Sequence, residues 1–148
     1  QSKMNITNKI ITSYINPLYT GSSPKLNELR AFAEEKRVPI ILKDTEGLLL
    51  NLLRIKRPER LLEIGAAVGY SACCFAEGCG CSVSTIEADK ETYETALSNV
   101  QNLGFDDKVK VLHGDAREVM ENLASDISEE GIYRRPYILQ QQDRPLAV

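Results

Sequence analysis

The chain has 148 residues, of which 43% are hydrophobic and 26% are charged, and its formal net charge is −3. These values are typical of one globular domain that can bury a core without disulfides or metals. A balance of 18 basic against 21 acidic residues disfavours non-specific binding to nucleic acid as the main activity. No stretch approaches the ~18 consecutive apolar residues of a membrane span, and the N-terminus lacks the hydrophobic region of a secretory signal. We therefore expect a cytoplasmic protein that does not act at a membrane.

The four cysteines are Cys73, Cys74, Cys79 and Cys81. Adjacent cysteines do not easily form a disulfide with each other, and no pair has the C-x2-C spacing typical of metal sites. Thiols of cytosolic proteins stay reduced. We predict that these four are buried or half-buried small apolar side chains rather than a metal or redox site.

The N-terminal part of the chain is predicted to be helical. Residues 1–23 contain a short, weakly helical segment and a connector rich in turn residues. The Ser-Pro pair at the start of segment 23–37 is typical of an N-cap followed by proline at the first helical position. Residues 38–42 form a short extended apolar segment. Asp44 is predicted to cap the next helix, which Pro58 ends.

From residue 60 onwards, short apolar runs alternate with amphipathic segments. Strands are predicted over 60–64, 82–86 and 109–112, and helices over 69–76, 90–103 and 117–123. Gly104 lies where a left-handed C-terminal helix cap is expected. Strands that alternate with helices favour a parallel sheet covered on both faces. The alternation stops at Ala124, so we predict an irregular tail over 124–148 after a three-stranded unit.

The segment from Glu63 to Ser71 carries the strongest functional indication, because a strand ends, a glycine-containing turn follows and a helix begins. Gly65 removes a Cβ where a ligand would approach the backbone, and Gly69 is expected to allow close packing of the helix on the strand. A helix N-terminus offers N–H groups and the positive end of its dipole. Nucleotide-like ligands bind at this place, beyond the carboxyl ends of parallel strands.

The residue types in this turn favour S-adenosylmethionine over a dinucleotide. Ala67 stands at the second glycine position of the dinucleotide motif, where its methyl group would crowd a pyrophosphate. Glu63 would repel a diphosphate but suits a ligand with an ammonium group, and S-adenosylmethionine has an ammonium group and no phosphate. Glu87 ends the second strand, where a carboxylate can accept both ribose hydroxyls. A nicotinamide oxidoreductase is therefore disfavoured.

Asp115 and Ala116 follow the third strand, where an adenine edge would lie. An acceptor for the adenine amino group and a backbone N–H for a ring nitrogen would fit there. Taken singly, the residues have simpler interpretations: Glu87 as a solvated strand-end charge, and Asp115 as a helix N-cap. His113, the single histidine, is interpreted as a strand-end residue without a catalytic role. The three strand ends together favour a methyl-donor pocket.

The runs EIGAAVGYSA, TIEAD and HGDA resemble those of class I S-adenosylmethionine-dependent O-methyltransferases. Within that superfamily, the chain is most similar to the group of catechol and caffeoyl-coenzyme A O-methyltransferases, and to bacterial members such as a tRNA 5-hydroxyuridine methyltransferase. The resemblance implies an α/β Rossmann-like fold with a mostly parallel sheet, helices on both faces and added N-terminal helices. Residues 24–123 would form the N-terminal part of the cofactor-binding domain.

The resemblance also implies which residues contact the cofactor. These are Glu63, Gly65 and Ala66 at the methionine end, Ser71 at the carboxylate, Glu87 at the ribose, Asp115 and Ala116 at the adenine, and the backbone of Ile41. No catalytic residue is assigned.

Members of this group continue with a fourth strand that carries an acidic metal ligand, and with a later Asp-Asn pair. No such motif follows Leu123. The family's divalent metal, typically magnesium, activates the acceptor hydroxyl as a Lewis acid, so we predict that this chain lacks the metal ligands and is truncated at its C-terminus.

The predicted function is methyl transfer to a hydroxyl of a small catechol-like molecule or of a hydroxylated tRNA base, by a homodimer. The alternative is a fragment that binds S-adenosylmethionine without catalysis, because it lacks the acceptor and metal half.

Overall fold

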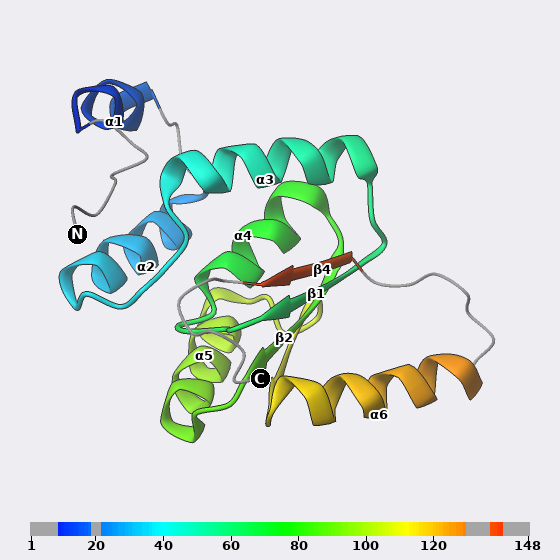
Figure 1. The fold of residues 1–148 in the computed structure, drawn as a ribbon. Helices are drawn as coiled ribbons and strands as arrows, with labels where there is room; N and C mark the ends of the chain where they lie inside the picture. The colour runs from blue at the N-terminus through cyan, green and yellow to red at the C-terminus, as the bar shows by residue number, and fades with distance from the viewer. Residues whose placement is uncertain (1–8, 19–21, 130–136, 141–148) are drawn as a thin grey trace, which may run out of the picture.

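The computed structural model describes residues 9–18, 22–129 and 137–140. Its first elements are all helical, and strands alternate with helices from residue 60 onwards (Figure 1). In chain order they are α1 (Lys9–Ile15), the 3-10 helix η1 (Asn16–Leu18), α2 (Pro24–Glu35), α3 (Lys43–Lys56), β1 (Arg60–Ile64), α4 (Tyr70–Cys79), β2 (Ser82–Glu87), α5 (Lys90–Leu103), β3 (Val109–His113), α6 (Ala116–Glu129) and β4 (Tyr137–Gln140).

The four strands form one parallel sheet in the order β3-β2-β1-β4. Glu63 of β1 lies opposite Thr85 of β2, and Glu87 at the end of β2 lies opposite His113 of β3. Because all strands run in one direction, the turns that follow β1, β2 and β3 meet at one edge of the sheet. The predicted α/β fold with a parallel sheet is confirmed.

The C-terminal part of the described chain corrects the sequence analysis. The predicted irregular tail is wrong for two segments, since α6 continues to Glu129 and Tyr137–Gln140 forms β4 beside β1. A strand of four residues has too few positions to show a period, and its pairing with β1 is a long-range contact that local patterns do not report. The rest of 124–148 lies outside the described residues, and the boundaries at residues 23 and 123 stay predictions.

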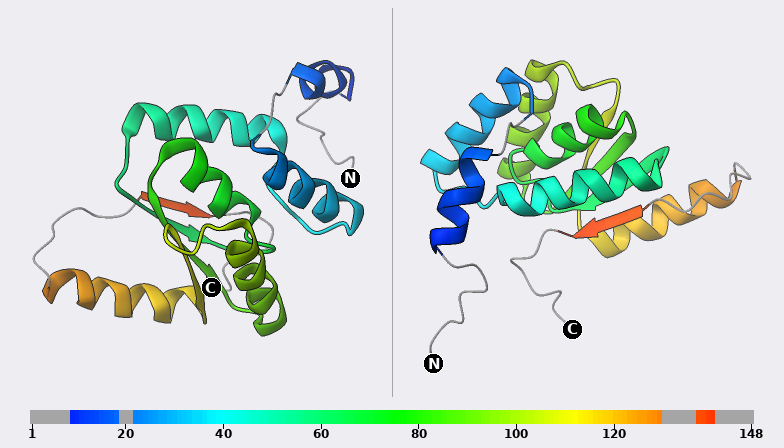
Figure 2. Two further views of the ribbon diagram at one scale, coloured as in Figure 1. Left: turned by 180° about the vertical axis from the view of Figure 1, so that it is seen from behind. Right: turned by 90° about the horizontal axis from the view of Figure 1, so that it is seen from above.

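Helices cover both faces of the sheet. Helices α3, α4 and α5 lie on one side, with α3 packed on α4, while α6 lies on the other side (Figure 2). Apolar side chains of β1, β2 and α4 dominate the core; they include Leu61, Val83, Ala72, Phe75 and Ala76. The buried helix α4 therefore has its first turn fixed next to the carboxyl ends of the strands.

The helix ends agree only partly with the predictions. Ser23 is the N-cap residue of α2, although its side chain makes no capping bond, and Gly104 closes α5 in the left-handed region with φ 76°. The predicted cap at Asp44 is wrong, because α3 begins one residue earlier, at Lys43. Asp44 lies in the first turn, where its carboxylate accepts the Thr45 N–H and a negative charge suits the helix dipole.

Gly69 is needed for a different contact from the one predicted. It adopts φ 81°, and a Cβ there would lie 3.2 Å from the Ala96 carbonyl oxygen and 3.3 Å from Val100 Cγ2. Both neighbours belong to α5, so the glycine permits close approach of two helices rather than of a helix and a strand.

Three of the four cysteines are buried and Cys79 is half-buried, and all four are free thiols, as predicted. No helix in the described ranges has both the length and the apolar character that a membrane crossing requires.

Candidate functional site at the carboxyl edge of the sheet

The turn after β1 is tied to the neighbouring strand through its backbone. The N–H groups of Gly65 and Ala66 both donate to the Ile86 carbonyl, at 2.9 and 3.2 Å, and the Gly69 N–H donates to the Ala66 carbonyl at 2.8 Å. Gly65 has φ 94° and Ala67 has φ 47°, a conformation that is unusual for a residue with a Cβ. The turn is therefore a fixed structure that leads directly into α4.

Glu87 connects the ends of all three N-terminal strands. Its Oε2 accepts the Ala67 N–H and its Oε1 accepts the Asp89 N–H, each at 3.1 Å, and its carbonyl accepts the Gly114 N–H at 3.0 Å. The carboxylate is half-buried, and each of its oxygens has a second lone pair for a further donor. This arrangement fits a ligand that presents two neighbouring hydroxyl groups.

Glu63 has no exposed surface. Its carboxylate accepts the Ser71 hydroxyl at 2.5 Å and the Thr85 hydroxyl at 2.6 Å. Glu63 thus fixes the first turn of α4 to β1 and β2. The Ser71 hydroxyl hydrogen, which the sequence analysis directs to a cofactor carboxylate, points to Glu63 here.

Asp115 precedes α6 and is exposed. Its Oδ1 accepts the Arg117 N–H at 2.9 Å and its carbonyl accepts the Val119 N–H at 3.0 Å, so it caps the helix that begins at Ala116. The Gly114 N–H bond to Glu87 places this turn beside the end of β2. The His113 ring stacks at a tilt on Tyr93, with 5.2 Å between ring centroids.

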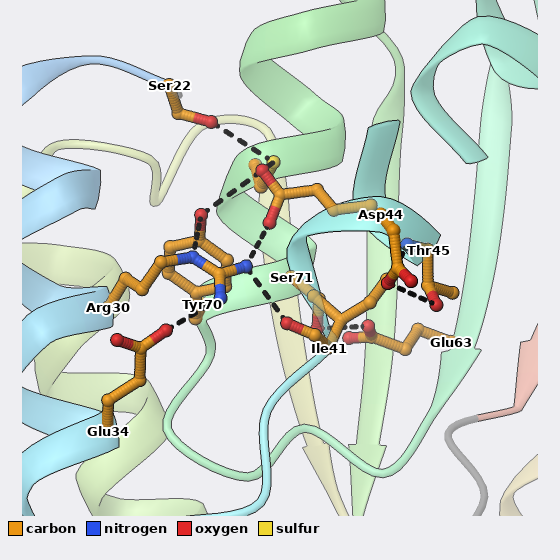
Figure 3. Close-up of polar contacts among 11 residues, drawn as sticks. Ser22, Arg30, Glu34, Ile41, Asp44, Thr45, Glu63, Tyr70 and Ser71 are labelled. Carbon is orange, nitrogen blue, oxygen red and sulfur yellow. Dashed lines mark hydrogen bonds and ion pairs between the residues drawn. The ribbon is translucent and has the colours of Figure 1, made fainter. Parts of the chain in front are cut away.

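A buried polar cluster that the sequence analysis missed joins α2, α3 and α4 (Figure 3). It consists of Arg30, Glu46, Tyr70 and Cys74, from α2, α3 and α4. Arg30 forms an ion pair with Glu46, and both Tyr70 Oη and Cys74 Sγ donate to Glu46 at 3.2 Å. Arg30 Nη2 also donates to the Ile41 carbonyl at 2.9 Å.

Two positions in the helical patterns indicate this cluster. Arg30 falls between Leu26 and Ala33 on the buried face of α2, and Glu46 precedes Leu50 and Leu53 on the buried face of α3. A charged residue at a core position is rarely left unpaired. An arginine and a glutamate on the apolar faces of consecutive helices therefore indicate a buried ion pair from the sequence alone. The bond from Arg30 to the Ile41 carbonyl is visible only in the structure.

Burial determines the ionisation of the cluster's donors. It raises the pKa of the Tyr70 phenol and of the Cys74 thiol far above their ordinary values. Burial likewise raises the pKa of Glu46, while hydrogen bonds from Cys74 and Tyr70 lower it. Phenol and thiol, which are protonated at neutral pH even with ordinary pKa values, consequently remain donors at alkaline pH as well.

The structure brings most of the predicted cofactor contacts to one place. Gly65 and Ala66 bond the Ile86 carbonyl, the next residue in the turn, Ala67, bonds the Glu87 carboxylate, and Ser71 and Glu63 lie at the helical end of the turn. Ile41 reaches the same helix through Arg30 and Tyr70. The contacts of these residues with a cofactor stay predictions.

The residues that the structure describes do not provide a site for the metal that the resemblance implies. In residues 9–18, 22–129 and 137–140, no group of three His, Cys, Asp or Glu side chains could hold a metal ion. The strand β4, Tyr137-Ile138-Leu139-Gln140, contains no carboxylate.

Comparison with known proteins gives a consistent result. Residues 18–133 match the family described as O-methyltransferase. The chain is 30% identical over 135 residues to a flavonoid 3',5'-methyltransferase of Vitis vinifera, covering 82% of this chain and 55% of that protein. It is 30% identical over 118 residues to a catechol O-methyltransferase of Mycobacterium tuberculosis, covering 77% and 54%.

A solved structure has the same fold. It is a Staphylococcus aureus protein assigned as a caffeoyl-CoA O-methyltransferase, with a TM-score of 0.72 and 32% identity over 77% of this chain and 55% of that one. The chain spans about half the length of each of these three relatives.

Proposed function

Because the chain belongs to the O-methyltransferase family, we propose that it binds S-adenosylmethionine at the carboxyl edge of its sheet and supports methyl transfer to a hydroxyl group. The observation that carries this proposal is the Glu87 carboxylate, held by the N–H groups of Ala67 and Asp89 at the end of β2. A fixed acceptor pair of this kind matches the two hydroxyls of a ribose.

The other strand ends have groups that fit the rest of the cofactor. Gly65 and Ala66 present backbone close to the start of α4, where a methionine moiety would lie against the helix N-terminus. Asp115 and Ala116 would meet the adenine beside Glu87. When bound, S-adenosylmethionine supplies an electrophilic methyl group on its sulfonium. The residues of this chain orient that group for in-line attack, so their contribution is positioning.

The acceptor is proposed to be a small phenolic or catechol-like molecule. The names of the Vitis vinifera and Mycobacterium tuberculosis relatives point to this class, and a net charge of −3 gives no general attraction for RNA. A hydroxylated tRNA base is the alternative acceptor.

The protein is likewise proposed to be a cytoplasmic homodimer. Leu48, Leu52 and Ile55 form an exposed apolar stripe on α3 that a second copy could cover. Sedimentation equilibrium tests this assembly.

A second candidate function is binding of S-adenosylmethionine without methyl transfer. The sequence of β4 favours it, because the strand contains no acid where the resemblance implies a metal ligand. Labelled methyl transfer to catechol and to 5-hydroxyuridine, with and without magnesium, distinguishes the two candidates. Turnover supports the transferase, whereas binding without turnover supports the second candidate.

The binding experiment is isothermal titration of S-adenosylhomocysteine into the wild type, Glu87→Ala and Glu94→Ala. Glu94 is an exposed carboxylate on α5 and serves as the matched control for loss of charge. Loss of charge-assisted hydrogen bonds is worth about 1.5–3 kcal/mol, so Glu87→Ala should raise the Kd roughly ten- to hundredfold. Equal binding by Glu87→Ala and wild type would contradict the site.

A further inference from the structure

Arg30, on α2, contacts three other parts of the chain. Its side chain is almost completely buried, and it lies over the Tyr70 ring with 4.6 Å from Cζ to the centroid. Its Nε donates to Tyr70 Oη at 3.0 Å, and its Nη1 donates to Glu34 at 3.1 Å. One planar guanidinium thus joins α2 to α3, α4 and the segment 38–42.

Two of these contacts lead to the site at the sheet edge. The Ile41 carbonyl that accepts from Arg30 belongs to the segment whose backbone is predicted to touch the cofactor. Tyr70, the other partner, lies between Gly69 and Ser71 at the start of α4. Arg30 therefore holds two separate pieces of chain in a fixed relation next to the methionine end of the predicted site.

We propose that Arg30 is a positioning residue that fixes the segment 38–42 against the first turn of α4 and thereby shapes the part of the site that takes the amino-acid end of the cofactor. This inference rests on the proposed function. Lysine could not replace it, because an ammonium group lacks the planar set of donors that reaches Tyr70, Glu46 and the Ile41 carbonyl together.

Stability alone is a weak reason for this cluster. A buried ion pair contributes little or nothing compared with well-packed apolar residues of similar volume. An apolar cluster would join α2, α3 and α4 equally well, but it would leave the Ile41 carbonyl without its donor. The polar cluster therefore has a positional consequence that an apolar one lacks.

The test compares two ligands that share the nucleoside. S-adenosylhomocysteine has the amino-acid end, whereas 5′-methylthioadenosine lacks it, so the ratio of their Kd values reports on that end alone. Arg30→Lys should raise the Kd of S-adenosylhomocysteine at least tenfold and change that of methylthioadenosine less than threefold. Arg54→Lys, at an exposed arginine of α3 that bonds the Gly78 carbonyl, is the matched control and should change neither.

A second variant separates positioning from folding. The triple change Arg30→Met, Glu46→Leu and Tyr70→Phe makes the cluster apolar and should leave the thermal midpoint near or above that of the wild type. It should still lose affinity for S-adenosylhomocysteine selectively. Equal weakening of both ligands, or wild-type binding by a folded variant, would overturn the role of Arg30. Failure of the wild type to bind either ligand would instead overturn the proposed function, and this inference with it.

Discussion

Ser71, in the first turn of α4, donates its hydroxyl hydrogen to the buried carboxylate of Glu63 on β1, with 2.5 Å between the oxygen atoms. A serine hydroxyl has one hydrogen to donate. While this bond exists, the Ser71 hydroxyl has no hydrogen left to donate to a cofactor carboxylate. The pair is consequently a structural link as well as a candidate binding element.

This link predicts a large effect of Ser71→Ala on stability. Removing one donor from a buried carboxylate leaves it less well satisfied, which costs about 1–3 kcal/mol. We expect urea unfolding to show a loss in that range for Ser71→Ala. Ser98→Ala, at an exposed serine on α5, should lose less than about 0.5 kcal/mol. A loss no greater than that of the control would show that Glu63 does not depend on Ser71.

Gly69 and Gly80 form a second matched pair. Both have positive φ, at 81° and 68°, but a Cβ would contact α5 at Gly69 and nothing within 4 Å at Gly80. Left-handed backbone costs a non-glycine residue about 1–2 kcal/mol, and overpacking adds about 1–3 kcal/mol. Gly69→Ala should therefore destabilise the protein by clearly more than Gly80→Ala in chemical denaturation. Equal losses would mean that α5 shifts freely to accept the methyl group.

The sequence predicts the first part of the fold well because local signals are strong there. Glycines at helix ends and short apolar runs in strands mark the elements from β1 to the start of α6 by themselves. The strand β4 was missed because only its pairing with β1 makes Tyr137–Gln140 a strand. The same reason applies to the bonds of Arg30 with Tyr70 and with the Ile41 carbonyl, because these partners lie in other elements of the fold.

The site shows the same division. Position along the chain suffices to place Glu87 and Asp115 at strand ends, and the structure places them there. Position along the chain does not reveal that Glu63 is fully buried and that its carboxylate accepts hydrogen bonds from two hydroxyl groups. Burial depends on the packing of α4 over β1 and β2, which no local pattern of residues specifies.

Thiol accessibility gives a further prediction. Cys73, Cys74 and Cys81 are buried and Cys79 is half-buried, and burial raises the pKa of every one of these thiols. Because the thiolate is the reactive form, the native protein should react slowly with iodoacetamide at pH 8. Peptide mapping should find Cys79 modified first, and the other three only after unfolding in urea. Early modification of Cys73 would contradict the packing of α4.

The same burial predicts that stability falls at alkaline pH. Burial, together with the charges of Glu63 and Glu77, raises the pKa of Cys73 from 9.0 to about 12. Between these two values the unfolded chain has lost the thiol proton and the folded chain retains it. The contribution of the raised pKa to the free energy of unfolding is therefore complete below pH 9 and is lost as pH rises toward 12, with a slope of about 1.4 kcal/mol per pH unit for one such group.

Urea unfolding under reducing conditions at pH 8, 9, 10 and 11 should show this decline in stability. Cys74 and Tyr70 should add to it, because burial raises their pKa values as well. Cys73→Ala should reduce the slope above pH 9 by about one group's share. An unchanged slope in this variant would mean that Cys73 ionises in the folded protein as readily as in the unfolded chain.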